Sequence, residues 1–352
     1  MSEPTKPETL DRVLDAALAR AADEPVRFDV TAGRNALAAA LQARAAEPVA
    51  VERRPRRRVR WLAAAAAVAV LTGGSLVAST VDLTGVGSNS ATAAEELIHA
   101  ADLASRVVER PIAPGQYRYV RSRYEGITRA WGSDEAWTTD MVNEQWIPAD
   151  RRDEWMLRFT INSVAWVPGH EGQGTPDSGP FKNGDEFRGK CGKYSYYAEG
   201  QPDRCTNATF HNPTPEFIAA LPKDPKELLA RLREEGHADD AGAFMQALDA
   251  LRSGQYPAEV RANLFRALAL LPGLVVTDNR ANLDGKEGVA LGKKYYDNFT
   301  EIIIDPDNGD FIGTREVIAE DQSGDQGTMK KGTVISSSAV TSALVGSLGA
   351  RP

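Results

Sequence analysis

The sequence has few of the residues that build metal centres and catalytic sites. Its 352 residues include two cysteines and four histidines, and no pair among His99, His170, His211 and His237 has the spacing of metal ligands. The Gly-x-Ser-x-Gly, His-Glu-x-x-His and Walker motifs are absent, as is a Gly-x-Gly-x-x-Gly that opens a helix. These absences give no support to catalysis, so we expect a protein that is not an enzyme and that has no cofactor or metal.

Long uncharged runs are scarce, and the one that matters covers residues 61–81. As a helix it would be about 31 Å long, enough to cross a bilayer. Six arginines stand directly before it, within residues 53–60, and such clusters stay on the cytoplasmic side. We therefore expect a single-pass protein of the cell membrane with residues 1–60 inside and 82–352 outside. A cleaved signal peptide is the alternative, but sixty residues before the run favour an uncleaved anchor.

Charge and composition divide the rest of the chain. Residues 82–352 carry 29 Lys and Arg against 40 Asp and Glu, so the outer part is acidic. Nucleic acid and anionic membrane surfaces would repel it, and we expect no nucleic-acid partner. The predicted order is a cytosolic helical segment (1–47), a basic juxtamembrane linker (48–60), a transmembrane helix (61–81), a spacer (82–92) and an extracytoplasmic domain (93–352).

The two cysteines, Cys191 and Cys205, both lie on the predicted outer side. An oxidising compartment permits a disulfide between them, and closing a loop of about 15 residues stabilises by roughly 3 kcal/mol in the chain-entropy model. A metal pair or a redox switch is the alternative. Neither has support, because no histidine lies at ligand spacing and Cys-x-x-Cys is absent. We expect a disulfide.

The cytosolic segment carries an apolar stripe without a core of its own. Leu10, Val13, Leu14 and Leu18 fall on one face of a predicted helix, and a second helix is expected over residues 32–46. Two short helices bury too little surface to fold securely alone. Either they dock on a partner or they are partly disordered, and in the first case the stripe is the partner-binding surface.

The periodicity of the outer part changes from helix to strand and back. Helical spacing covers residues 93–108, with Leu97, Ala101, Ala104 and Val108 expected on the buried face. Alternation then predicts a three-stranded meander at 116–125, 135–147 and 154–167, followed by a Gly-rich loop or insertion at 169–190.

Four helices and a second group of strands follow. The helices are expected at 214–221, 225–235, 239–252 and 257–271, and the strands at 274–278, 288–297, 300–304 and 311–319, with a final edge strand at 334–345. Residues 305–310 place three aspartates near each other, but Asn308-Gly309 between apolar strands favours a hairpin turn over a calcium loop. This order predicts the α+β class, an antiparallel sheet with helices covering one face.

Tryptophan is concentrated in the predicted meander. Five of the six tryptophans lie within 36 residues: Trp131, Trp137, Trp146, Trp155 and Trp166. A sheet face this aromatic must be covered, since each ring buries some 150 to 250 Å². The rings form either the core beneath the helices or an apolar groove that accepts a lipid or a peptide.

Several turn and cap motifs resemble those of a family of uncharacterised single-pass proteins of high-GC bacteria, whose genes neighbour those of extracytoplasmic-function sigma factors. They are Pro-Gly-Gln-Tyr-Arg-Tyr-Val at 114–120, Gln-Trp-Ile-Pro-Ala-Asp-Arg at 145–151, Ala-Leu-Pro-Lys-Asp-Pro at 220–225, Arg-Ala-Leu-Ala-Leu-Leu-Pro-Gly at 266–273 and Ile-Asp-Pro-Asp-Asn-Gly at 304–309. The outer domain is also similar in layout to carrier and sensor domains of the LolA and RseB type. That resemblance implies a half-open antiparallel barrel with helices on its concave side.

The resemblance further implies an anti-sigma-like architecture. Zinc-binding anti-sigma domains need a His and two Cys, which residues 1–60 lack, so a sigma factor would be held by helix packing alone. Two functions remain open. The first is a membrane-anchored envelope sensor or regulator that binds a sigma factor, and the second is a tethered binding module for lipid or lipoprotein.

Overall fold

The computed structural model describes residues 80–83, 90–130, 133, 135–176, 179–197, 203–324 and 327–352. The predicted cytosolic segment with Leu10, Val13, Leu14 and Leu18, the basic linker, nearly all of the predicted span, and Trp131 lie outside these residues. Within them, no helix is both long enough and apolar enough for a membrane crossing. Thr80 and Val81, the last two residues of the predicted span, are extended and lie beside Thr333 and Gly332, with Val81 N donating to Gly332 O at 2.7 Å.

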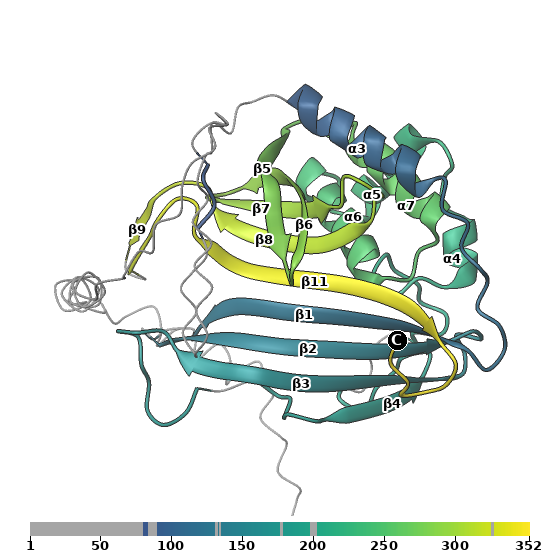
Figure 1. Cartoon of the computed structure of the whole chain (residues 1–352), viewed down its shortest axis with the longest axis horizontal. Coiled ribbons are helices and arrows are strands. Elements are labelled where there is room, and N and C mark those ends of the chain that lie inside the picture. Colours follow the sequence, from purple (N-terminus) through teal and green to yellow (C-terminus); the bar gives the residue numbers. More distant parts are fainter. Residues whose placement is uncertain are drawn as a thin grey trace, which may run out of the picture.

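The described residues form one large antiparallel sheet and a group of helices, which confirms the α+β class (Figure 1). Its strands are β1 (Tyr117–Arg129), β2 (Ala136–Pro148), β3 (Glu154–Trp166), β4 (Glu186–Lys190), β5 (Leu274–Leu283), β6 (Lys286–Tyr295), β7 (Asn298–Ile304), β8 (Phe311–Ile318) and β11 (Val334–Val345). They are hydrogen-bonded in the order β4-β3-β2-β1-β11-β8-β7-β6-β5, so the sheet has two edges and is not closed into a barrel. A small hairpin, β9 (Gln322–Gly324) and β10 (Gly327–Met329), stands apart from it.

Strand β11 occupies the middle of the sheet, so the prediction of an edge strand over 334–345 was wrong. It pairs with β1 along ten residues, from Gly126 with Ser336 to Tyr117 with Val345, and with β8 on its other side. The strands β1 to β4 and β5 to β8 form two meanders, and β11 joins them. The loop predicted over 169–190 was also partly wrong, because its last five residues form β4 on the edge of β3.

The described residues contain five helices, and capping side chains mark the start of three of them. They are α3 (Ser90–Ala104), α4 (Pro215–Ala219), α5 (Pro225–Glu235), α6 (Asp240–Ser253) and α7 (Ala258–Leu268). Thr214, Asp224 and Asp239 cap α4, α5 and α6 through their side chains, each accepting a hydrogen bond from a backbone N–H of the first turn. Of the stripe predicted for α3, Leu97, Ala101 and Ala104 are buried. Val108 lies beyond the end of the helix and is exposed.

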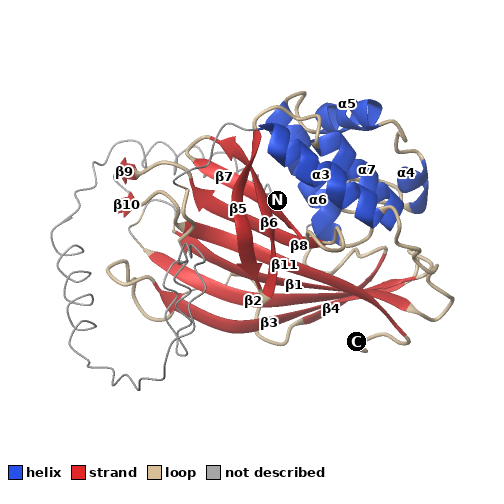
Figure 2. Ribbon diagram, turned by 45° about the horizontal axis from the view of Figure 1, so that its top comes forward, coloured by secondary structure: helices blue, strands red, loops and turns tan. Residues whose placement is uncertain are grey.

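The helices pack on one face of the β5–β7 half of the sheet (Figure 2). Leu97 of α3, Phe244 of α6 and Phe265 of α7 share a core with Leu291, Ile302 and Ile304 of the strands. At the other half of the sheet the end of α6 approaches β1. There Gly254 ends α6 with a left-handed φ of 63°, and a Cβ on it would lie 2.9 Å from Cγ1 of Val120 on β1. This close approach sets the position of α6 over β1.

The predicted hairpin turn at 305–310 is confirmed. Asp305 N donates to Asp310 O and Gly309 N to Asp305 O, both at 2.9 Å, and β7 and β8 pair on either side. At the same end of these strands, Asp284 in the turn between β5 and β6 reaches β1, where its carboxylate pairs with Arg121 at 2.7 Å and Arg123 at 2.8 Å. Strands β5 and β1 are not neighbours in the sheet, so this contact shows that the β5–β6 hairpin bends across it.

Candidate ligand-binding site

A cavity of about 300 Å³ lies between the sheet and the end of α6. We call it the chamber. Its floor is the β1–β3 half of the sheet: Val120, Ser122, Asn143, Gln145, Leu157 and Phe159. Its roof is the end of α6 and the following turn: Asp249, Arg252, Ser253 and Gln255. Its side wall comes from the segment after β4: Tyr194, Tyr196, Tyr197, Arg204 and His211.

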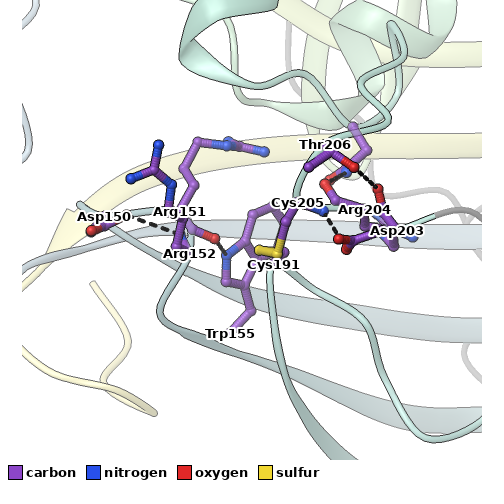
Figure 3. Close-up of a disulfide and its surroundings, with 10 residues drawn as sticks. Asp150, Arg151, Arg152, Trp155, Cys191, Asp203, Arg204, Cys205 and Thr206 are labelled. Atoms are coloured by element: carbon purple, nitrogen blue, oxygen red, sulfur yellow. Dashed lines mark hydrogen bonds between the residues drawn. A yellow bond between two sulfur atoms is a disulfide. The ribbon is translucent and has the colours of Figure 1, made fainter.

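The side wall is held by the disulfide between Cys191 and Cys205, which the structure contains, with the two Cα atoms 5.2 Å apart (Figure 3). Cys191 and Gly192 both have positive φ, 56° and 69°, and turn the chain sharply after β4. A Cβ on Gly192 would lie 2.7 Å from the ring of Trp155, so only glycine fits this turn without a shift. The turn, the disulfide and the buried Trp155 together fix the start of the tyrosine-rich wall.

Two buried acceptors of the chamber have no hydrogen-bond partner among the described residues. They are Oδ1 of Asn143 on the floor and Oε1 of Gln255 in the roof. Gln255 is 8% exposed, and its Nε2 donates a hydrogen bond to His211 O at 3.4 Å. This bond holds the amide group in place, and Oε1 has no hydrogen-bond partner among the described residues. A buried acceptor without a partner costs about 1–3 kcal/mol. A ligand that donates hydrogen bonds would recover this free energy.

The remaining lining combines aromatic rings and hydroxyl groups with the charged Arg204, Asp249 and Arg252. Gln145 Nε2 donates to the Tyr194 hydroxyl at 2.9 Å, and Arg204 donates to the Tyr197 hydroxyl. Burial raises the pKa of Tyr194 and of Tyr196 above the usual value, so both hydroxyls keep their protons at physiological pH. The chamber thus presents ring faces beside polar atoms, a lining typical of sites for small amphipathic molecules.

Ser253, His211 and Asp249 all line the chamber, yet they are not arranged as a hydrolytic triad. Ser253 Oγ donates to Ala250 O at 2.6 Å and accepts from Gln255 N at 3.2 Å. Asp249 Oδ1 accepts from Arg252 at 3.1 Å. A triad needs hydrogen bonds from the nucleophile to the base and from the base to the carboxylate, and here both outer members have other partners.

The structure does not bring the predicted tryptophans together in one groove. Trp155 lies beneath the side wall with Leu157 and Phe159, whereas Trp146 lies on the opposite face of the sheet with Tyr119, Met156 and Val345. Trp137 and Trp166 form an edge-to-face pair, with centroids 6.0 Å apart, at the far ends of β2 and β3. Ligand binding by any of these rings stays a prediction.

Sequence reasoning missed the residues that do surround the chamber. Asn143, Arg204 and Gln255 are far apart in the sequence and belong to no motif. One signal was present: Tyr194, Tyr196 and Tyr197 stand between the two cysteines, so a disulfide there brings three rings into one short wall.

Comparison with known proteins adds little. No family model matches the chain, and no curated protein matches it. Among solved structures, the crystal structure of a DUF1329 family protein from Desulfovibrio piger is similar over 74% of this chain and 94% of its own, with 9% identity and a TM-score of 0.19. A TM-score this low supports no conclusion on fold or function. The resemblance to sigma-factor-linked membrane proteins stays a prediction.

Proposed function

We propose that the chain is a membrane-anchored, non-enzymatic sensor whose described domain binds a small amphipathic ligand in the chamber. The observation that carries this proposal is the pair of unpartnered acceptors, Asn143 Oδ1 and Gln255 Oε1, in an aromatic cavity. The ligand is expected to bear hydroxyl or amine donors beside an apolar body. Ligand sites in proteins have volumes of about 300–1,000 Å³. The chamber, at about 300 Å³, lies at the lower end of this range.

The same lining bears on the alternative, a tethered module for lipid or lipoprotein. An acyl chain in the chamber would leave both amide oxygens without a partner, because it has no hydrogen-bond donor. The small volume also favours one compact molecule over a lipid with several chains. A polar amphiphile therefore fits the chamber better than a lipoprotein acyl group.

The double variant Asn143→Leu, Gln255→Met tests the chamber. Both changes keep the approximate side-chain volume and remove the two acceptors, so ligand binding should weaken tenfold or more, if each lost hydrogen bond contributes about 1 kcal/mol. The measurement is native mass spectrometry of the full-length chain, purified in detergent, for co-purified small molecules. Gln246→Met, on α6 but outside the chamber, is the matched control and should retain the ligand. Equal ligand content in the double variant, or none in the wild type, would contradict the proposal.

The predicted cytosolic segment would transmit the signal of the proposed sensor by binding a partner. This segment lies outside the described residues. In the context of the family resemblance, its partner is a sigma factor bound through Leu10, Val13, Leu14 and Leu18. The double variant Leu14→Asp, Leu18→Asp would place two charges in that interface. It should weaken binding of the sigma factor to the full-length chain by several kcal/mol, measured as lower retention of the sigma factor. Ala16→Asp with Ala19→Asp adds the same charge off the stripe and should leave retention unchanged. Equal retention by both variants would favour the tethered binding module.

A further inference from the structure

A second cavity, of about 630 Å³, is lined by both cysteines of the disulfide. We call it the arginine cavity. The turn between β2 and β3 contributes Asp150, Arg151 and Arg152, and the side wall contributes Arg204 and the disulfide. Trp155 lies between the two groups (Figure 3). Its ring is fixed by two contacts, the donation of Nε1 to Arg151 O at 2.9 Å and the close approach of Gly192.

Arg151 has no counter-ion among the described residues. Its guanidinium stacks over Trp155, 4.6 Å from the ring centroid, and makes no ion pair with a described carboxylate. Desolvation lowers the pKa of Arg151 to about 10, and the charges of Arg118 and Arg204 act in the same direction. The half-buried Arg118 and Arg261 differ from it, because both pair with Glu109.

Arg204 is also left without a carboxylate. Its guanidinium stacks on Tyr197, 4.9 Å from the ring centroid, and donates one hydrogen bond to that hydroxyl. Its Nε is buried and has no partner among the described residues. Two desolvated guanidinium groups on the wall of one cavity repel each other and have spare donors, which is an unfavourable arrangement unless an anion lies between them.

The two carboxylates of the cavity wall are already engaged. Asp150 Oδ1 accepts from the backbone N of Arg152 at 3.0 Å. Glu216 accepts hydrogen bonds from its own backbone N–H and from Thr214. These bonds lower the pKa of Glu216 and direct its carboxylate to the first turn of α4. Neither carboxylate forms an ion pair with Arg151 or Arg204. The positive charges of these two arginines are therefore left for a ligand.

We propose that Arg151 and Arg204 bind an oxyanion, a carboxylate or phosphate group, in the arginine cavity. A guanidinium presents parallel N–H donors that match the oxygens of either group. Trp155 and Tyr197 hold the two guanidinium planes from behind, so little side-chain freedom is lost on binding. This site does not depend on occupancy of the chamber, although Arg204 lines both cavities.

Titration of the full-length chain with inorganic phosphate and, separately, with acetate tests the proposal, against sodium chloride at equal ionic strength. The readouts are the midpoint of thermal unfolding and the dissociation constant from isothermal titration calorimetry. We expect at least one of the two anions to raise the midpoint above that in chloride. Which anion does so distinguishes a phosphate ligand from a carboxylate ligand.

Three variants assign the effect to these residues. Arg151→Gln and Arg204→Gln should each weaken anion binding tenfold or more, and Arg151→Lys, which keeps the charge but loses the fork, should weaken it several-fold. Arg188→Gln removes an exposed arginine of the neighbouring strand β4 and should bind within twofold of the wild type. No response of the wild type to either anion, or an unchanged response in both glutamine variants, would overturn the proposal. The chamber variant Asn143→Leu, Gln255→Met should bind the anion normally, so failure of one site does not imply failure of the other.

Discussion

Replacing Cys191 and Cys205 by alanine is expected to lower the free energy of unfolding by about 2–4 kcal/mol. The disulfide closes a loop with a sequence separation of 14, and its loss frees the unfolded chain. The same change removes the anchor of the wall that carries Tyr194, Tyr197 and Arg204, so ligand binding in the chamber should weaken as well. Urea unfolding of the full-length chain, followed by fluorescence, measures the first effect.

The control for this result is the wild-type protein under reducing conditions. Reduction should shift the unfolding midpoint in the same direction as the double replacement, and the double variant itself should not respond to the reductant. An unchanged midpoint in the variant would mean that the wall is held by packing alone. Two thiols that alkylate freely in the denatured, non-reduced protein would show that the bond does not form.

Deleting residues 349–352 is expected to lower the free energy of unfolding by about 1–3 kcal/mol, because it leaves the buried Glu144 without its charged partner Arg351, whose side chain is itself largely exposed. Glu144 is 2% exposed and accepts from Tyr119 at 2.7 Å and from Arg351 Nε and Nη2 at 2.5 Å. Ala350 O also accepts from Trp146 Nε1 at 2.5 Å, so the deletion uncovers a ring that is 0% exposed. Denaturant unfolding measures the loss, and a red shift of the native fluorescence should accompany it.

Arg280→Ala is the matched control for this deletion. It removes an exposed arginine paired with the exposed Glu287, and such pairs contribute about 0–1 kcal/mol. A deletion variant as stable as this control would show that the tail does not hold Glu144 in solution.

Acid should weaken the contact between the tail and Glu144. Desolvation favours protonation of Glu144, but the hydrogen bonds from Arg351 and Tyr119 outweigh it and hold its pKa below the usual value of about 4.3. The stabilisation is therefore complete above about pH 4.3, the unfolded value, and is lost as pH falls through the lower folded pKa. Below that pH the difference in stability between the wild type and the deletion variant should narrow, and the part that comes from the cover over Trp146 should remain.

Most helices and strands could be predicted because their signals are local. Asp224 and Pro225 mark the start of α5, Gly236 marks its end, and its predicted bounds match the observed ones. The alternation of Trp155 and Leu157 with Met156 and Arg158 gave β3 in the same way. Such patterns contain no information about which strand lies beside which. Strand β11 was therefore expected at an edge, whereas its central position depends on pairing with β1 and β8.

The chamber could not be predicted for a related reason. Its acceptors come from β2 and from the turn after α6, more than a hundred residues apart, and each is an ordinary amide until the fold leaves it unpartnered. For the tryptophans the sequence led to the opposite error. Because they are close in the sequence, we expected them to share one surface. Residues 146 and 155 lie on opposite faces because Trp146 pairs with Met156, one position beyond Trp155.

The central position of β11 bears on the order in which the chain folds. The ribosome makes β1 to β8 first, and until β11 follows, β1 and β8 each have one edge without a partner. The ten-residue pairing between β1 and β11 joins residues more than two hundred positions apart, which makes it slow to form. Two unpaired edges in a half-made chain invite association with other chains. We expect the sheet to form only after synthesis of β11, so the nascent chain depends on chaperones or on export in the unfolded state until then.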